Sequence, residues 1–140
     1  MRNIKFRGKS NDEWVYGLLL KSDKDDKYKY LIQSDHEKCK CCGKELVKYF
    51  ITNEKTIGQY TGLKDRNMKE IYEGDIVKFR FKEDREEFPD LIGYIEYQST
   101  FAAFRIMSNQ GSFKIDITEI KFIEKIGNIY DNPESLEKGE

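Results

Sequence analysis

The second half of the chain alternates apolar and polar residues with a period of two, which predicts β-strands. In the segment IVKFRF, Val77, Phe79 and Phe81 fall on one face of a strand. Lys78 and Arg80 fall on the other face. The segments LIGYIEY, FAAFRIM, SFKIDI and EIKFIEKIGNIY continue this pattern, with turn signals roughly every 8–12 residues. This rhythm is typical of a small barrel or sandwich.

The first half is also strand-like but less regular. Its candidate strands are IKFRG, WVYGLLL, YKYLIQ and LVKYFI. The charged stretches 21–29 and 82–90 predict solvated loops. A helix is expected only near the end, where Asn132 can cap it, Pro133 fits the first helical position and Glu134 favours the positive end of the helix dipole.

Two glycines mark special points in this pattern. Gly93 interrupts LIGYIEY and predicts a bend or a close approach of another backbone. Gly74 lies between Glu73 and Asp75, so this segment resembles either a paired-carboxylate site or a tight turn that leads into a strand. We favour the turn, in which Gly74 supplies the unusual backbone angle and Asp75 accepts hydrogen bonds from N–H groups of the turn.

Composition narrows the class of protein. The 140 residues are enough for one domain with a real core, and the 14% aromatic content argues against disorder although 36% of the residues are charged. A net charge of −1 disfavours a nonspecific nucleic-acid binder, although a local basic patch is compatible with it. No apolar run is long enough to span a bilayer, and the opening MRNIKFRGKS lacks the apolar core of a signal peptide. We therefore expect a cytoplasmic protein without membrane contact.

The segment HEKCKCCGKE carries the residues most suited to metal chemistry. Cys39 and Cys42 form a C-x-x-C pair followed by Gly-Lys, as in zinc knuckles, and His36 and Cys41 lie close in sequence. A tetrahedral structural zinc site usually needs a second pair of ligands distant in sequence, and the chain has no second His. The simpler interpretation is a surface loop with reduced thiols in a reducing compartment. We therefore assign no metal, and the zinc alternative, within one chain or shared between two, stays open.

No constellation in the sequence indicates catalysis. The chain has a single His. It lacks a G-x-S-x-G motif, a P-loop and a glycine-rich dinucleotide turn. Among 26 acidic residues some pairs arise by chance, and a solvated charge is the usual explanation of each. We predict a protein that is not an enzyme, with no catalytic residues and no cofactor.

A basic stripe is predicted on the outward face of one strand. Lys78, Arg80 and Lys82 form it, and Tyr94 and Arg105 belong to strands that could neighbour it. Basic and aromatic side chains on a small barrel hold single-stranded nucleic acid in some proteins. Charged outer faces also keep strands soluble and discourage edge pairing. Nucleic-acid binding is therefore an alternative to a purely structural role.

The segment TIGQYTGLKDRNMKEIYEGDIVKF (56–79) strongly resembles the YopX family of small phage and prophage proteins. The blocks MRNIKFRGKS, WVYG, GYIEY and EKIGNIYDNPESL extend the resemblance over most of the chain. Two places depart from the family pattern. Met68 occupies a turn position where Gly is usual, so we expect the left-handed conformation to fall on Asn67. The cysteine-rich segment is not part of the pattern.

The resemblance implies an SH3-like small β-barrel, a phage or prophage origin and a cytoplasmic location in a bacterial host. It brings no established activity, catalytic residue or cofactor. We expect a mainly-β protein with an N-terminal β-rich segment (1–62) packed on an SH3-like barrel (63–127), and a C-terminal turn or short helix that frays after Leu136 (128–140). The expected core residues are Trp14, Val77, Phe79, Ile95, Phe104, Phe113 and Ile115.

The predicted function is that of a non-enzymatic accessory protein that binds a protein partner or a second copy of itself. Exposed strand edges would allow self-association, so a homo-oligomer is expected. The alternative is a nucleic-acid-binding module that uses Lys78, Arg80 and Lys82.

Overall fold

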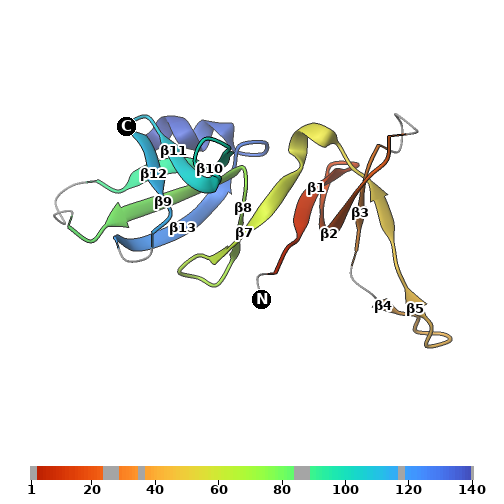
Figure 1. Ribbon diagram of the computed structural model, residues 1–140. Helices are drawn as coiled ribbons and strands as arrows, with labels where there is room; N and C mark the ends of the chain where they lie inside the picture. The colour runs from red at the N-terminus through yellow and green to blue at the C-terminus, as the bar shows by residue number, and fades with distance from the viewer. Residues whose placement is uncertain (1–2, 24–28, 35–36, 84–88, 117–118, 140) are drawn as a thin grey trace. The chain divides into compact units, whose positions relative to one another are not determined.

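The computed structural model shown in Figure 1 describes residues 3–23, 29–34, 37–83, 89–116 and 119–139. The predicted mainly-β fold is confirmed, because nearly all regular structure consists of antiparallel strands. The chain divides into two compact units, Met1–Tyr60 and Thr61–Glu140, which are described separately below. No helix in the described ranges is long and apolar enough to cross a membrane.

The N-terminal unit is built on antiparallel strands that follow the order β6-β3-β2-β1-β7. Their bounds are β1 Phe6–Ser10, β2 Glu13–Lys21, β3 Tyr30–Gln33, β6 Tyr49–Ile51 and β7 Gly58–Lys64, which extends into the second unit. In place of one strand over LVKYFI, the structure has β6 and the shorter β5 (Glu45–Leu46), which pairs with β4 (Glu37–Lys38). A one-turn 3₁₀-helix, Glu54–Thr56, precedes β7.

A small core holds this unit together on one side of its sheet. Ile32 is fully buried. Gly8 permits close packing here, because a Cβ at Gly8 would overlap the Thr52 methyl group and would lie 3.3 Å from Ile57. Trp14, expected in the core, is only partly buried, and the Arg7 guanidinium lies 4.5 Å from its ring centroid. The indole therefore covers a buried Arg7 instead of joining the aliphatic core.

The C-terminal unit contains a five-stranded antiparallel sheet in the order β12-β11-β10-β9-β13. The strands are β9 Asp75–Phe81, β10 Leu91–Gln98, β11 Ala103–Ser108, β12 Gly111–Lys114 and β13 Ile120–Asn128. The short strand β8 (Glu70–Tyr72) precedes them, and the 3₁₀-helix η2 (Pro133–Gly139) follows. A turn at residues 109–110 joins β11 to β12, where Ser108 pairs with Gly111.

Most of the expected core lies in this unit. Val77, Phe79 and Ile95 are buried, at 0–1% exposure. Phe104, Phe113 and Ile115 are partly buried and pack against the same cluster. The cluster is completed by Ile71, Ile106 and Ile120. Phe79 and Phe113, on strands that are not neighbours in the sheet, have ring centroids 6.0 Å apart, so the sheet curls around its core.

This curl falls short of the closed SH3-like barrel that the resemblance implied. Within the described parts of the chain, no strand pairing joins the two ends of the sheet, β12 and β13. The fold is therefore established as mainly β with open antiparallel sheets, and SH3-like closure stays a prediction.

Three local expectations have clear outcomes. At Gly93 a Cβ would lie 2.5 Å from the Met107 carbonyl oxygen on β11, which confirms the predicted close approach. The prediction for Asn67 is wrong, because Met68 itself takes the left-handed conformation, with φ 64°. The terminal 3₁₀-helix is present but extends to Gly139, beyond the predicted fraying point at Leu136.

The prediction that the Asn132 side chain caps this terminal helix is wrong, and only its backbone carbonyl takes part in the helix. The Ser135 N–H donates to the carbonyl oxygen of Asn132 at 3.0 Å. The Asn132 side-chain oxygen instead accepts from the Asn128 N–H, at 3.4 Å.

Candidate functional site

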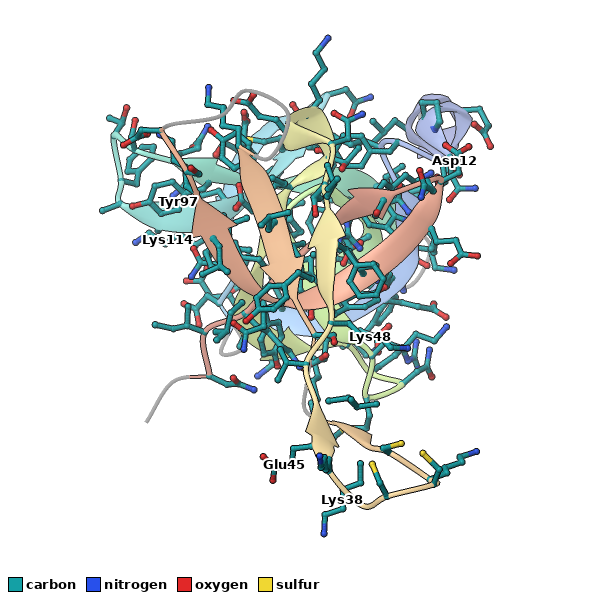
Figure 2. The ribbon with its side chains drawn as sticks, turned by 90° about the vertical axis from the view of Figure 1, so that its right-hand side faces the viewer. Asp12, Lys38, Glu45, Lys48, Tyr97 and Lys114 are labelled. Carbon is teal, nitrogen blue, oxygen red and sulfur yellow. The ribbon has the colours of Figure 1, made fainter. Side chains whose placement is uncertain are left out.

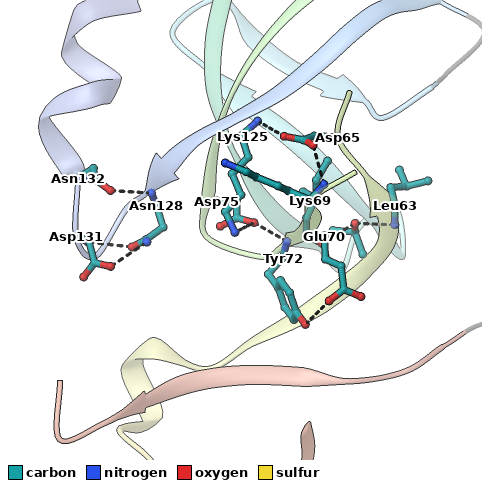
Figure 3. A network of polar contacts seen from close by, with 12 residues as sticks. Leu63, Asp65, Lys69, Glu70, Tyr72, Asp75, Lys125, Asn128, Asp131 and Asn132 are labelled. Carbon is teal, nitrogen blue, oxygen red and sulfur yellow. Dashed lines mark hydrogen bonds and ion pairs between the residues drawn. The ribbon is translucent and has the colours of Figure 1, made fainter. Parts of the chain in front are cut away.

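The Glu73–Gly74–Asp75 segment forms a turn, as the sequence predicted. Gly74 has φ 88°, a left-handed conformation that glycine adopts without strain. Asp75 is fully buried, and its Oδ2 accepts a 2.7 Å hydrogen bond from the Tyr72 N–H. The same oxygen lies 3.3 Å from the Lys125 ammonium (Figure 3). A carboxylate held inside the fold in this way stabilises the turn and is not presented to a substrate.

Asp65 has the same role in the preceding turn, and the sequence analysis did not single it out. Its Oδ1 accepts from the backbone N–H groups of Asn67 (2.8 Å) and Lys69 (2.9 Å). Its Oδ2 accepts from the Lys125 N–H at 3.0 Å, which ties the turn to β13. The Asp-x-Asn spacing is typical of an Asx-turn and could have identified it.

The surroundings of Asp65 alter its acidity. Burial acts to raise the pKa of this carboxyl group, because it disfavours the charged form. The backbone hydrogen bonds from Lys125, Lys69 and Asn67, together with the Lys69 charge, outweigh burial and lower the pKa below 3.8. Asp65 is therefore ionised at neutral pH and serves as an anchor for backbone donors.

The proposed basic stripe lies on one face of the C-terminal sheet but is interleaved with acidic groups. The Lys78 ammonium lies 3.6 Å from the carboxylate of Glu124 on β13. The Arg80 Nε donates to Asp90 at 2.7 Å. Lys82 is exposed, one residue beyond the end of β9. These ion pairs reduce the positive potential that a phosphate backbone would meet.

The two other residues linked with the stripe lie on the same face. Tyr94 pairs with Ile76, and Arg105 pairs with Glu96. The Arg105 Nε donates to the Ser112 Oγ at 2.6 Å, and its guanidinium lies 4.3 Å from the Phe101 ring centroid. Arg105 thus has intramolecular contacts with its neighbours on β12 and in the β10–β11 turn.

The cysteines occupy the tip of the β4–β5 hairpin, which Figure 2 shows beyond the labelled Lys38 and Glu45. The Sγ atoms of Cys39, Cys41 and Cys42 all lie within 4.8 Å of one another. Those of Cys39 and Cys41 are 2.8 Å apart. The structure therefore gathers all three predicted thiols, while His36, the fourth candidate, lies outside the described residues.

Hydrogen bonds at this tip make the Cys39 thiol more acidic than a free thiol. Its interaction with the Cys41 thiol and the backbone N–H groups of Cys41 and Cys42 lowers the pKa of Cys39 from 9.0 to about 7. The same thiol–thiol contact raises the pKa of Cys41. The pKa of Cys39 therefore lies close to neutral pH, where part of the thiol is in its nucleophilic, metal-binding thiolate form.

A second feature that the sequence analysis missed is an apolar face on the N-terminal sheet. Strand pairing aligns Leu18 with Gln33 and Tyr49 in one row across β2, β3 and β6. It aligns Leu20 with Leu31 and Ile51 in the next row. We define the β2–β3–β6 face by the residues of these rows and the neighbouring Tyr16: Tyr16, Leu18, Leu20, Leu31, Gln33, Tyr49 and Ile51.

Most of the side chains on this face are open to solvent. Exposure reaches 46% for Tyr16, 53% for Leu18, 41% for Leu20, 57% for Tyr49 and 46% for Ile51. None of the seven carries a charge. The pattern was hard to find because Leu18, Leu19 and Leu20 are all apolar, so a period of two does not distinguish the buried side of β2 from the exposed one.

A comparison with protein families identifies the chain. The family described as YopX protein matches residues 5–137, nearly the whole length. The chain belongs to the YopX family. A search of curated proteins finds no match. Among solved structures, this YopX-family chain resembles the crystal structure of protein EF1440 from Enterococcus faecalis, with a TM-score of 0.56 and 23% identity over 97% of this chain and 99% of that one. This likeness concerns the fold.

Proposed function

We propose that this protein is a non-catalytic accessory protein that acts by self-association through its β2–β3–β6 face. The observation that carries the proposal is the row of exposed, uncharged side chains on that face. As the family resemblance implies, we place it in a phage or prophage and in the cytoplasm of the bacterial host. Its partner is a second copy of the chain, and another protein is the alternative partner.

The size of the face supports an interface. Its five exposed apolar side chains are each 41–57% accessible, which corresponds to an apolar patch of roughly 500 Å², within the range where such patches on monomers are often functional. A standard interface buries about 800 Å² per partner. The apolar rows with their polar margins are large enough to supply most of this area.

The chemistry of the face favours a second copy of the same chain. A two-fold interface brings the same patch of both subunits together, so any charge on the patch risks facing itself. An uncharged face avoids this repulsion. Gln33 and the two tyrosine hydroxyls can still hydrogen-bond across the interface, which provides orientation.

Analytical ultracentrifugation over a range of protein concentrations tests the proposal. We expect a reversible dimer in the wild type. Leu18→Lys and Tyr49→Lys each place a charge against its own copy, and we expect each to weaken association by at least about tenfold. Met68→Lys is the matched control, because Met68 is 71% exposed and lies in a turn of the other unit.

Two results would overturn self-association through this face. One is a wild type that stays monomeric at about 100 μM, where even a weak complex would be detectable. The other is an equal loss of association in Met68→Lys and Leu18→Lys. Circular dichroism of each variant separates weaker association from unfolding.

The contacts of the buried carboxylates support a non-catalytic role. Asp65 and Asp75, the buried acidic residues among those described, accept backbone hydrogen bonds within turns. A general acid or base must instead reach a proton on its substrate. The pKa of Asp65 is lowered, whereas a carboxyl group used as a general acid needs a raised one.

Nucleic-acid binding through Lys78, Arg80 and Lys82 has weaker support. Glu124 and Asp90 already lie against the first two of these side chains. Phosphate binding would have to compete with these ion pairs, and its affinity would fall steeply with salt. Measurable binding of single-stranded DNA or RNA at low salt, lost on adding salt, would favour this alternative.

A further inference from the structure

The β4–β5 hairpin brings three thiols to one point by local folding alone. The strands are two residues each, paired as Glu37 with Leu46 and Lys38 with Glu45. The Cys39 N–H donates to the Lys44 carbonyl oxygen at 2.7 Å, and the Gly43 N–H donates to the Cys39 carbonyl oxygen at 2.8 Å. These two bonds close the loop and turn its side chains toward its tip.

Gly43 gives this loop its shape. It has φ 71°, in the left-handed region where a side chain is disfavoured. A Cβ at this position would meet no atom within 4 Å, so the need for glycine is one of backbone conformation and not of space. A C-x-x-C-Gly turn in which the glycine is left-handed is suited to hold two thiolates on the same side of the chain.

The distances between the sulfur atoms fit one small cation. A Zn–S bond of about 2.3 Å in tetrahedral geometry places pairs of sulfur atoms roughly 3.8 Å apart. The three Sγ atoms here lie within 4.8 Å of one another, with the shortest distance 2.8 Å. The sulfur–sulfur distances in the hairpin therefore lie within about one ångström of those that a shared zinc ion requires.

We propose that Cys39, Cys41 and Cys42 form a binding site for a thiophilic divalent cation, for which zinc is the chemical match. Each thiol loses a proton as it binds, and three thiolates with Zn²⁺ carry a net charge of −1. The same hairpin carries three lysines, Lys38, Lys40 and Lys44, against two glutamates, Glu37 and Glu45, and this excess of one positive charge offsets the charge of the site. One tetrahedral position is left for a further donor, such as water.

The site would stabilise a weak element. A two-stranded hairpin is marginal at best in water, and the described side chains of β4 and β5 are exposed. Metal binding contributes directly to the folding free energy of a segment that does not hold its shape alone. The inference does not depend on the proposed self-association, because the hairpin tip is separate from the β2–β3–β6 face.

The experiment uses the full chain, purified in a reductant without chelator, loaded with zinc and dialysed. Metal analysis is expected to find about one zinc per chain. Substituting cobalt for zinc is expected to produce a thiolate-to-metal charge-transfer band in the near ultraviolet. We expect three variants, Cys39→Ser, Cys41→Ser and Cys42→Ser, each to weaken metal binding by more than about a hundredfold. This loss is larger than the roughly 10–100-fold that follows when only a hydrogen bond to a metal ligand is removed.

Lys40→Gln is the matched control, because it changes an exposed side chain of the same tip and keeps all three thiols. We expect it to retain one metal per chain and the cobalt band. Less than about half an equivalent of zinc in the wild type would overturn the proposal. So would equal metal retention by the three serine variants, which would indicate adventitious binding, or a disulfide among the three cysteines in the zinc-loaded protein.

Discussion

Single polar residues in this protein often serve the backbone. Asp65, 4% exposed, gathers three backbone N–H groups from the turn after it and from β13. Asn128 does the same for the turn that follows β13, since its Oδ1 accepts from the N–H groups of Tyr130 and Asp131. In both cases a side chain satisfies donors that no strand can pair. Asp65 and Asn128, which both lie in segments that resemble the YopX family, therefore stabilise turns.

Asp65→Asn should destabilise the fold in a pH-dependent way. An amide has only one oxygen acceptor, so the Lys125 N–H loses its partner, and we expect a loss of about 1–3 kcal/mol at neutral pH. Because the folded pKa of Asp65 lies below 3.8, its contribution is complete above pH 3.8 and is lost as the pH falls through the folded value. The stability gap between wild type and variant should therefore narrow in acid.

Urea unfolding of both proteins at neutral pH and near pH 3 measures this gap. Glu96→Gln, a change at an exposed carboxylate on β10, is the control and should show little difference at neutral pH. A gap for Asp65→Asn that stays constant or widens on acidification would show that the charge of Asp65 does not carry the effect.

At the scale of elements, alternation predicted β9 well and β2 poorly, for a physical reason. Phe79 alternates with charged neighbours on β9, so only one side can face the core. Leu18, Leu19 and Leu20 are all apolar, so the pattern does not reveal that one side of β2 is exposed. The hairpin at Cys39 was missed as an element because two-residue strands leave no periodic signal.

Gly93→Ala tests the close contact between β10 and β11. The added Cβ would lie 2.5 Å from the Met107 carbonyl oxygen and 2.7 Å from the Ile106 Cγ2, and a backbone oxygen on a paired strand cannot easily move away. We expect a loss of about 1–3 kcal/mol, the usual cost of overpacking, measured by urea unfolding. Glu96→Ala, on the same strand with its side chain exposed, should cost less than about 0.5 kcal/mol. Equal losses would assign the effect to β10 in general and not to this contact.

At the scale of the molecule, the sequence predicted the family, the β content and most of the larger core. Val77, Phe79 and Ile95 could be identified because burial on one side of a strand imposes a readable alternation. The alternation of apolar and polar residues could not show whether the sheet closes into a barrel, because closure depends on pairing between strands far apart in the chain. The β2–β3–β6 face was equally hidden, since Leu18, Gln33 and Tyr49 meet only once three strands are aligned.

The two units should unfold in separable steps, because each has buried residues of its own. Trp14 is the only tryptophan and lies in the N-terminal unit, so its fluorescence reports on that unit, whereas circular dichroism reports on both. Ile95→Ala removes about 2–5 kcal/mol from the C-terminal core. We expect this variant to unfold earlier by circular dichroism while the midpoint of the Trp14 fluorescence transition stays close to that of the wild type.

Ile32→Ala, in the N-terminal core, is the reciprocal control and should lower the Trp14 midpoint. All measurements belong at low protein concentration, so that self-association does not stabilise either unit. If Ile95→Ala lowers both midpoints equally, the chain unfolds as one cooperative unit and the division at Tyr60 has no thermodynamic counterpart.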